Sequence, residues 1–287
     1  MRTIIFRDGR LYREDAALIS PLDNGFLFGE GVFETMRADR GRIFLLPQHL
    51  ERLLRGLELL EIPRPEIFPR IPDLGDEIIR ADGLQEGCAA VKLAISSGAP
   101  GSTPTLLLQV RALESDFIRR RQRGLKAGLV PWRRDAANPL LAIKSLNYLE
   151  NRHALRLMRS RNLDEGIFLN QDGELCEGTF SNLFLVSGDT ILTPPESAGL
   201  LPGITRAFLL KNCRRIGLEI REQKLYPADL EKCDGAFVSS SLMDVAPLLQ
   251  LERQHFSPAK TAPLRGKLAR LFSSARQQQQ QQPAPWE

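Results

Sequence analysis

Residues 140–152, LLAIKSLNYLENR, place one lysine, Lys144, between a short apolar run and the expected start of a helix. Lysines are scarce in this chain, at 8 of the 39 basic residues, so a lysine in apolar surroundings needs an explanation. An amine is nucleophilic only when deprotonated, and desolvation lowers the pKa of a lysine toward that state. Lys144 is therefore a candidate nucleophile, as is Lys92 within AAVKLAIS. The alternative for both is a side chain that carries its charge from a half-exposed strand to solvent.

On the N-terminal side of this stretch, residues 1–118 show the pattern of a small α+β lobe. The Asp8-Gly9 and Asp39–Gly41 turns each separate two extended runs, as in β-hairpins. From Pro47 onward, leucines recur three or four residues apart, which predicts a helix with one apolar face. The other expected elements of this lobe are a helix over residues 66–82 and strands at 88–96 and 104–113.

On the C-terminal side, residues 128–275 alternate strands with helices and predict a second lobe. An interdomain linker is expected at 119–127, where both apolar periods disappear. Strands in antiparallel pairs with helices outside indicate an α+β fold rather than a doubly wound sheet. The glutamine-rich residues 276–287 are expected to be a disordered tail. Within the lobe we expect strands at 128–132, 165–170, 183–188, 190–194 and 235–241 and helices over about 147–161 and 205–216.

Composition describes a folded globular chain, with 43% hydrophobic and 26% charged residues. The net charge is +4, but basic and acidic residues are mixed along the sequence. The main exception is the run Arg119–Arg123, which has no aromatic interleaving and is better explained as a solvated turn than as a polyanion site. No nucleic-acid partner is therefore expected.

Cysteine spacing excludes a zinc or disulfide framework, because there is no CxxC pair and no metal-type pairing with the histidines. A reducing cytoplasm is the simplest setting. The N-terminus lacks the pattern of an export signal, and no apolar stretch reaches about 18 residues, so neither export nor membrane spanning is expected.

Three further features could carry chemistry. Glu177, in DGELCEGTFSNLFLV, follows a hairpin strand, and a carboxylate there could keep a pyridine nitrogen protonated or merely cap a turn. The loop GLLPGITR enters a helix at Thr205, which suits either a phosphate group or an ordinary cap. Arg52, in HLERLL, could bind phosphate through its guanidinium or lie on the surface.

In order and spacing, these features resemble the class IV (fold type IV) pyridoxal-phosphate enzymes. This family includes branched-chain and D-amino-acid transaminases and 4-amino-4-deoxychorismate lyase. The resemblance covers roughly residues 1–250. It rests on DNGFLFGEGVFETMR (23–37), HLERL (49–53), KSLNYLEN (144–151), EGTFSNLF (177–184), TPPESAGLLPGITR (193–206) and SSSLMDVAPL (239–248).

The resemblance implies a role for each candidate. Lys144 would form the Schiff base with pyridoxal 5'-phosphate and carry a proton, and Glu177 would face the ring nitrogen. It also implies a small N-terminal lobe, a C-terminal pseudo-barrel lobe with the lysine, the cofactor between them, and a homodimer. The remaining cofactor contacts would be Arg52, the amides of Ile204 and Thr205, and the hydroxyls of Thr205 and Ser241 for the phosphate, and Leu201 for the ring face.

The family machinery acts at an amino-bearing carbon and is compatible with two reactions. SSSLMDVAPL is similar to the lyase subgroup, which releases pyruvate and p-aminobenzoate, so the lyase is the favoured reaction. A branched-chain or D-amino-acid transaminase stays open. Ser97 stands where many relatives, lyases included, have arginine, so one candidate carboxylate-binding charge is missing for either reaction. A catalytically silent relative is disfavoured by the presence of both Lys144 and Glu177. The substrate is a small amino compound, whose expected contacts are Glu34, Met36, Lys92 and Arg111, with Arg37 as a further carboxylate-binding candidate.

Overall fold

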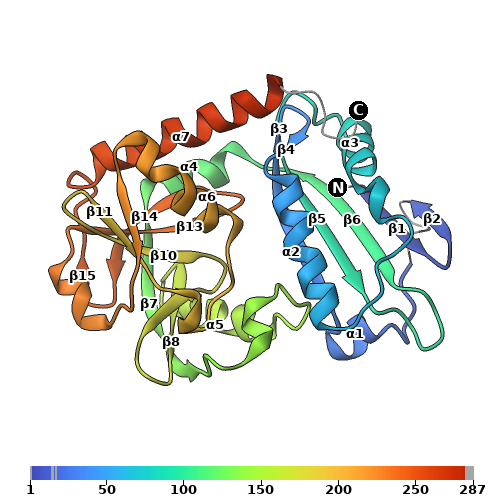
Figure 1. Ribbon diagram of the computed structural model, residues 1–287, viewed down its shortest axis with the longest axis horizontal. Coiled ribbons are helices and arrows are strands. Elements are labelled where there is room, and N and C mark those ends of the chain that lie inside the picture. Colours follow the sequence, from blue (N-terminus) through green and yellow to red (C-terminus); the bar gives the residue numbers. More distant parts are fainter. Residues whose placement is uncertain (1, 14–15, 17, 282–287) are drawn as a thin grey trace. The chain divides into compact units, whose positions relative to one another are not determined.

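The computed structural model describes residues 2–13, 16 and 18–281, and the chain divides into two compact units. The first unit comprises residues 1–114 and 143–148, and the second comprises 115–142 and 149–287. Each unit has its own sheet with helices packed against it (Figure 1). The predicted α+β fold with two lobes is therefore confirmed.

The boundary between the units differs from the predicted linker at 119–127. The chain divides after Glu114, and residues 119–123 belong to helix α4 (Ser115–Arg123). Strand β7 (Leu125–Arg134) begins almost at once. No apolar periodicity is visible in the sequence here because most residues of α4 are polar. Arg119 and Asp116 form an ion pair on the exposed side of this helix.

The first unit contains an antiparallel six-stranded sheet in the order β2-β1-β6-β5-β3-β4. Both predicted hairpins are present, because Asp8 and Gly9 and then Arg40 and Gly41 adopt the left-handed backbone conformation that tight turns require. The strands are β1 (Arg2–Arg7), β2 (Arg10–Arg13), β3 (Gly31–Asp39), β4 (Arg42–Ile43), β5 (Cys88–Ser96) and β6 (Thr105–Ala112).

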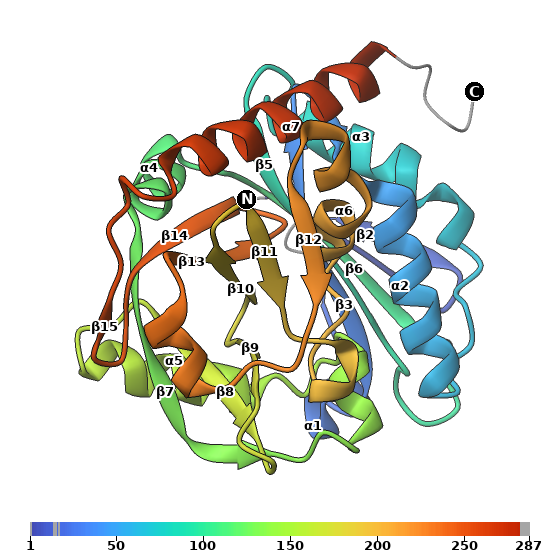
Figure 2. The same ribbon diagram turned by 60° about the vertical axis from the view of Figure 1, so that its left-hand side comes forward.

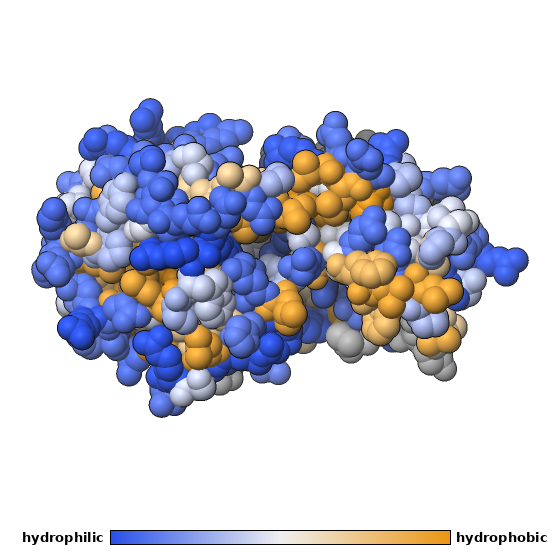
Figure 3. Space-filling view, turned by 90° about the horizontal axis from the view of Figure 1, so that it is seen from below, coloured by the Kyte–Doolittle hydropathy of each residue, from blue (hydrophilic) through white to orange (hydrophobic). Residues whose placement is uncertain are grey.

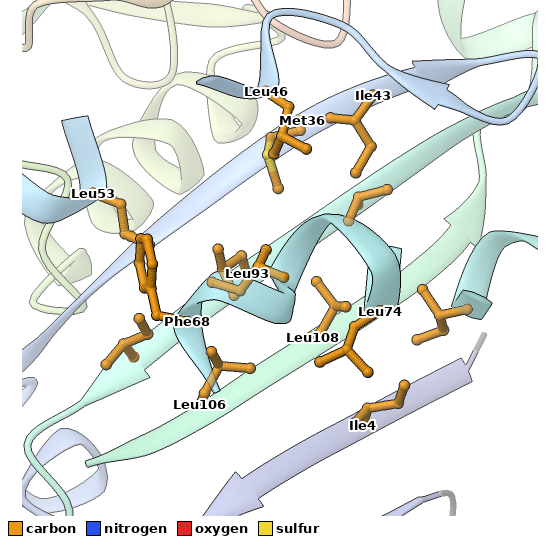
Figure 4. Close-up of a cluster of buried hydrophobic side chains, with 14 of the residues drawn as sticks. Ile4, Met36, Ile43, Leu46, Leu53, Phe68, Leu74, Leu93, Leu106 and Leu108 are labelled. Atoms are coloured by element: carbon orange, nitrogen blue, oxygen red, sulfur yellow. The ribbon is translucent and has the colours of Figure 1, made fainter. Parts of the chain in front are cut away.

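Helices cover one face of this sheet. The core holds the even-numbered residues of β3 and β6 and the odd-numbered residues of β5, packed against α2 (Leu46–Leu59) and α3 (Ile71–Ala81). Figure 4 shows this packing, with Leu93, Leu106 and Leu108 from the strands in one cluster with Leu74 from α3. Because side chains alternate along a strand, the intervening residues point to the opposite face. The short elements η2 (Phe68–Arg70) and α1 (Asn24–Phe28) complete the first unit.

Lys144 belongs to the first unit, whereas the sequence placed it in the C-terminal lobe. Ser145 forms an antiparallel bridge with Val32. The Phe33 amide donates to the Lys144 carbonyl at 2.8 Å, and the Leu146 amide donates to the Gly31 carbonyl at 2.8 Å. A Cβ at position 31 would meet the Ile95 carbonyl and lie 2.6 Å from Leu146 Cδ1, so glycine allows this close approach.

The second unit contains a nine-stranded sheet that closes on itself. Strands β10, β13, β14, β7, β8 and β9 are paired in that order, and β9 pairs again with β10 between Glu177 and Asn182. Figure 2 shows these strands curving around a common centre. The pairings of β7 with β8 and β14 are parallel, which the expected antiparallel pairs did not include. The other strands are β8 (Glu165–Asn170), β9 (Leu175–Gly178), β10 (Asn182–Ser187), β11 (Thr190–Thr193), β12 (Glu219–Glu222), β13 (Gly235–Ser240), β14 (Asp244–Leu251) and β15 (Gln254–His255).

Helix α7 (Ala262–Gln281) replaces part of the predicted disordered tail, and residues 282–287 lie outside the described residues. Glutamine is a good helix former, and Arg276 fixes the helix through a 2.9 Å ion pair with Asp244. In the described part of the chain, no helix is both long and apolar enough to cross a membrane. The second unit also contains α5 (Leu149–Ser160), α6 (Ile204–Asn212), η3 (Pro139–Ala142), η4 (Glu196–Ala198), η5 (Cys213–Ile216) and η6 (Pro227–Lys232).

Candidate active site

Two aromatic rings position the amine of Lys144. Its Nζ lies 4.5 Å from the centre of the Phe33 ring and 5.1 Å from that of Tyr148. The two rings meet edge to face with their centres 5.2 Å apart. Such rings attract a cation weakly while excluding water from one side of it. The sequence alone did not identify Phe33 or Tyr148 as neighbours of this lysine.

The strand register shows which side chains share a sheet face with Lys144. Thr35 pairs with Lys92, and Lys92 pairs with Gln109 on β6. Lys92 is exposed, and its Nζ lies 5.3 Å from the same Phe33 ring. Arg111, two residues beyond Gln109, is also exposed and points to this face. The structure therefore brings two of the predicted substrate contacts, Lys92 and Arg111, to the side of the sheet that carries Lys144.

Arg37 shares this face but is held by Asp39. Its Nε lies 2.9 Å from Asp39 Oδ2, and its Nη2 lies 2.8 Å from Oδ1. The side chain is only 8% exposed. Arg37 is therefore a weaker candidate for binding a substrate carboxylate than the exposed Lys92 and Arg111.

The other two predicted substrate contacts, Glu34 and Met36, lie on the opposite sheet face. Met36 is fully buried in the core, close to Ile43 and Leu46 (Figure 4). A one-residue step along a strand reverses the direction of the side chain, so these two point away from the face of Phe33 and Lys92. The structure does not bring Glu34 and Met36 to the exposed face, and we assign them no contact with substrate.

Glu34 instead orients Arg52. Arg52 Nε and Nη2 each lie 2.7 Å from one Glu34 oxygen, a bidentate geometry, and His49 Nδ1 lies 2.7 Å from Oε2. Burial raises the pKa of Glu34, but the charge of Arg52 and the hydrogen bond from His49 outweigh burial and lower it to about 2. Burial lowers the pKa of His49, whose Nδ1 faces the Glu34 carboxylate. The buried guanidinium of Arg52 is thus fixed in direction, and His49 is a further residue of this group that sequence reasoning missed.

In the second unit, Glu177 accepts hydrogen bonds from Arg134, Asn182 and the Leu201 amide. It is 7% exposed on β9. Arg134 Nη1 donates to Oε1 at 3.0 Å, while the Leu201 amide and Asn182 Nδ2 lie 3.1 and 3.4 Å from Oε2. An ion pair with a guanidinium favours the charged form of a carboxylate. Glu177 is therefore a fixed, negatively charged acceptor, as contact with a protonated ring nitrogen requires.

Arg134 is another residue of the candidate site that sequence reasoning missed. It is 4% exposed, and its Nε and Nη2 donate to Glu150 at 3.0 Å and to Asn151 at 2.9 Å. The guanidinium carbon lies 3.4 Å from the centre of the Phe168 ring. The only signal was the Arg133-Arg134 pair at the end of an apolar strand, and the sequence does not say which of the two points inward.

The start of helix α6 has features that suit an anion. Gly203 precedes the helix without any side-chain cap, and the first amides of a helix have no partner within it. A Cβ at Gly203 would collide with Asn182 Oδ1, so glycine is required beside β10. Ile204 and Thr205 are each 7% exposed. Leu201 is joined to this region through its bond to Glu177.

A serine without a hydrogen-bond partner lies on the neighbouring strand. Ser239 Oγ is buried and, among the described residues, has no partner. Ser239 pairs in register with Asn182, and Ser241 follows in the turn after β13. A hydroxyl of this kind fits a bound group with acceptor oxygens. The residues of the second unit therefore suit the phosphate and ring nitrogen of a pyridoxal-type cofactor.

Comparisons with known proteins agree with this geometry. The sequence model of the family described as Amino-transferase class IV matches residues 31–251. The chain belongs to the class IV aminotransferase family. It is 33% identical over 261 residues to an aminodeoxychorismate lyase from Bacillus subtilis, covering 88% of each protein. It is 24% identical over 281 residues to a branched-chain-amino-acid aminotransferase from Escherichia coli, covering 93% of this chain and 91% of that protein.

A solved structure described as a hypothetical aminotransferase from Mycobacterium tuberculosis, in its PLP-bound form, superposes with a TM-score of 0.84. The two sequences are 26% identical, and the superposition covers 95% of this chain and 98% of the Mycobacterium tuberculosis chain. The class IV chain is therefore an enzyme that uses pyridoxal phosphate. The bound cofactor supplies an electron sink that labilises a bond at the amino-bearing carbon. The residues present fit that cofactor, with Glu177 for its ring nitrogen and the α6 amides for its phosphate.

Proposed function

We propose that this enzyme is a 4-amino-4-deoxychorismate lyase that releases pyruvate and p-aminobenzoate. The observation that carries the proposal is the pair of exposed cations, Lys92 and Arg111, on the sheet face of Lys144. Each product contains one carboxylate, so the substrate contains two. Two separate cations match a dicarboxylate better than a branched-chain amino acid, whose side chain is apolar. The similarity to the Bacillus subtilis lyase supports the same reading.

The proposed roles follow the position of each residue. Lys144 binds the cofactor covalently and, as a free amine, removes the proton from the amino-bearing carbon. Loss of the enolpyruvyl oxygen from the ring then completes an aromatic ring, and a proton delivered to the leaving group gives pyruvate. The other proposed cofactor contacts are Glu177 for the ring nitrogen, Leu201 for the ring face, and Arg52, Ile204, Thr205 and Ser241 for the phosphate.

The alternative is a branched-chain or D-amino-acid transaminase. Its support is the similarity to the Escherichia coli aminotransferase, which covers nearly the whole chain. In a transaminase, Lys144 would also move the proton of the amino-bearing carbon, but no carbon–oxygen bond of the substrate would break. The two functions therefore differ in products, whereas Lys144 and Glu177 serve both.

The decisive experiment supplies 4-amino-4-deoxychorismate to the purified, cofactor-loaded protein. Repeated turnover to equal amounts of pyruvate and p-aminobenzoate, absent with Lys144→Ala, is the expected result. A protein that retains its lysine-bound cofactor but gives neither product would overturn the lyase. Conversion of L- or D-amino acids to keto acids by that protein would then establish the transaminase.

We also propose that the enzyme acts as a homodimer. Six large apolar side chains between residues 18 and 28 are exposed, among them Phe26 at 74% and Phe28 at 72%. Figure 3, viewed from the side on which Figure 1 draws α1, shows apolar surface on the first unit. Exposed patches of this kind mark protein interfaces, and a second copy is the partner that the family implies. The patch consists of Leu18, Ile19, Leu22, Phe26, Leu27 and Phe28.

The state of the cysteines indicates the kind of cellular compartment in which the protein works. All four, Cys88, Cys176, Cys213 and Cys233, are free thiols. Burial raises the pKa of Cys176 to about 12 and that of Cys213 to about 11, so both remain protonated and unreactive. Free thiols are maintained in a reducing compartment, and we propose the cytoplasm.

A further inference from the structure

Glu165 is a buried carboxylate that the proposed mechanism does not use. It is the first residue of β8 and has no exposed surface. Among the described residues it has no cationic partner; it accepts four hydrogen bonds instead. Burying a charge without a counter-ion is costly unless hydrogen bonds compensate for the lost water. A residue kept at this cost needs a structural or functional reason.

All four hydrogen bonds come from the chain beside Glu165 and from one turn. Oε1 accepts from the Gly166 amide at 2.9 Å, from the Thr179 amide at 2.9 Å and from Thr179 Oγ1 at 2.5 Å. Oε2 accepts from Ser181 Oγ at 2.7 Å. The turn fits closely, since a Cβ at Gly178 would lie 2.8 Å from Oε2 and collide with Ser181 Oγ. Glu165 thus fills the centre of the turn at 178–181.

This turn joins the two strand ends that carry the ring-nitrogen site. Glu177 precedes it at the end of β9, and Asn182, which reaches Glu177 Oε2, follows it at the start of β10. A change in the backbone of the turn would therefore shift Glu177 and also Asn182, which donates to its carboxylate. The paired register of Glu177 with Asn182 depends on the geometry of this connection.

A chain of hydrogen bonds returns from the turn to the same carboxylate. The Thr179 carbonyl accepts from Asn151 Nδ2 at 2.8 Å, and Asn151 Oδ1 accepts from Arg134 Nη2 at 2.9 Å. Arg134 Nη1 then donates to Glu177 Oε1 at 3.0 Å. Thr179 therefore contacts Glu165 through its amide and hydroxyl, and reaches Glu177 through its carbonyl. Such connected networks fix geometry more firmly than separate bonds.

We propose that Glu165 is a positioning residue that holds the turn at 178–181 and thereby fixes the orientation of Glu177 toward the cofactor. This inference rests on the proposed role of Glu177. Glu165 acts through shape and acceptor oxygens rather than through its charge. Burial raises the pKa of Glu165, although the hydrogen bonds from Thr179 and Ser181 oppose that rise. The contact with Ser181 survives protonation of Glu165, because the serine hydroxyl can rotate and accept a hydrogen bond from the protonated carboxyl group.

The experiment compares Glu165→Gln with Glu165→Ala in the cofactor-loaded enzyme. Glutamine retains an acceptor oxygen for Gly166 and Thr179, and its amide can donate to Ser181, so its cofactor spectrum and kcat should stay near wild type. Alanine should displace the pH midpoint of the cofactor absorbance by about one unit and lower kcat more than it raises KM. Equal spectra and kinetics for Glu165→Ala and wild type would overturn the proposal.

The matched control is Glu174→Ala. Glu174 is also buried, at 2% exposure, but it contacts Asn170 and Lys224 instead of the turn at 178–181. Its loss should lower the melting temperature without moving the absorbance midpoint. If Glu165→Ala fails to fold, Thr179→Val replaces it: this variant removes one bond to Glu165, and an unchanged midpoint in it would equally overturn the proposal.

Two reference measurements separate this inference from the proposed function. Wild-type enzyme without lyase activity would reject the substrate assignment while leaving the spectral comparison intact. A Glu177→Gln variant whose cofactor absorbance titrates as in wild type would reject the role of Glu177, and with it the basis of the inference. A shifted midpoint in both Glu177→Gln and Glu165→Ala is the expected result.

Discussion

Lys144 and Phe33 lie opposite each other at the edge of the six-stranded sheet, with the lysine Nζ 4.5 Å from the ring centre. The antiparallel bridge beside them fixes this relationship, because it sets which residue of β3 faces the lysine. Phe33, Thr35 and Arg37 therefore share the lysine's face, and Glu34 and Met36 do not. The register of β3 against residues 144–146 thus determines which β3 side chains can contact substrate and which belong to the core.

Lys144 should be the residue that binds the cofactor covalently. Reduction of the loaded enzyme with borohydride should leave a pyridoxyl group on Lys144, found by peptide mass spectrometry. Lys144→Ala should form no adduct and lose activity by about a thousandfold or more, since it lacks the group that moves the proton. Lys92→Met is the matched control, because it removes the neighbouring amine near Phe33 yet leaves Lys144 in place. An adduct on Lys92 in wild type would contradict the assignment.

Lys92 and Arg111 should contribute to substrate binding more than to the chemical step. Replacing either by methionine should raise KM by roughly 10- to 100-fold, the usual effect of losing a charge-assisted hydrogen bond. A smaller change is expected in kcat. Arg55→Met is the control, since Arg55 lies on α2 with its side chain 60% exposed and paired with the exposed Glu51. Unchanged KM in both test variants would remove the main support for a dicarboxylate substrate.

Much of the first unit could be predicted from sequence because local signals decide it. The Asp8-Gly9 and Arg40-Gly41 turns require left-handed backbone, and the leucines of α2 repeat with helical spacing. The motif resemblance located Lys144 and Glu177, which the structure places at a sheet edge and in a hydrogen-bonded site. Lys144 and Glu177 could be identified because each lies within a short sequence motif.

The remaining features depend on contacts between distant segments. The register of β3 with residues 144–146 determines that Glu34 and Met36 face away from Lys144, and no local pattern reveals it. The barrel closure between Glu177 and Asn182 likewise depends on β8 and β7 pairing in parallel. The glutamine run looked disordered by composition, whereas Arg276 and the buried Phe272 fix α7 through contacts with the rest of the unit.

Acid should destabilise the first unit through Glu34 and His49. The pKa of Glu34 is lowered from 4.5 to about 2 and that of His49 is lowered from 6.5, so the unfolded chain binds more protons below those ordinary values. The free energy of unfolding should therefore decrease as the pH is lowered, first below 6.5 because of His49 and then from 4.5 toward 2 because of Glu34. Urea unfolding of wild type and Glu34→Gln between pH 7 and 3 measures this effect.

In that comparison, Glu34→Gln should cost about 2–3 kcal/mol at neutral pH, and the difference from wild type should shrink below pH 4.5. Glu51→Gln is the control, because Glu51 is 68% exposed on α2, the helix that carries Arg52, and should change stability by less than about 0.5 kcal/mol. A Glu34→Gln deficit that is constant down to pH 3 would show that the carboxylate charge does not stabilise Arg52.

The apolar patch at residues 18–28 should be the contact between two copies of the chain. Phe26 and Phe28 are 74% and 72% exposed, and buried aromatic side chains are frequent hot spots of protein interfaces. Replacing both by serine should raise the dimer dissociation constant by roughly a thousandfold or more, since two truncations at about 2 kcal/mol each sum to about 4 kcal/mol. Sedimentation at several protein concentrations measures that constant. Leu149→Ser, which alters a side chain 65% exposed outside the patch, should leave it unchanged. Wild-type protein that sediments as a monomer at micromolar concentration would contradict the proposed dimer.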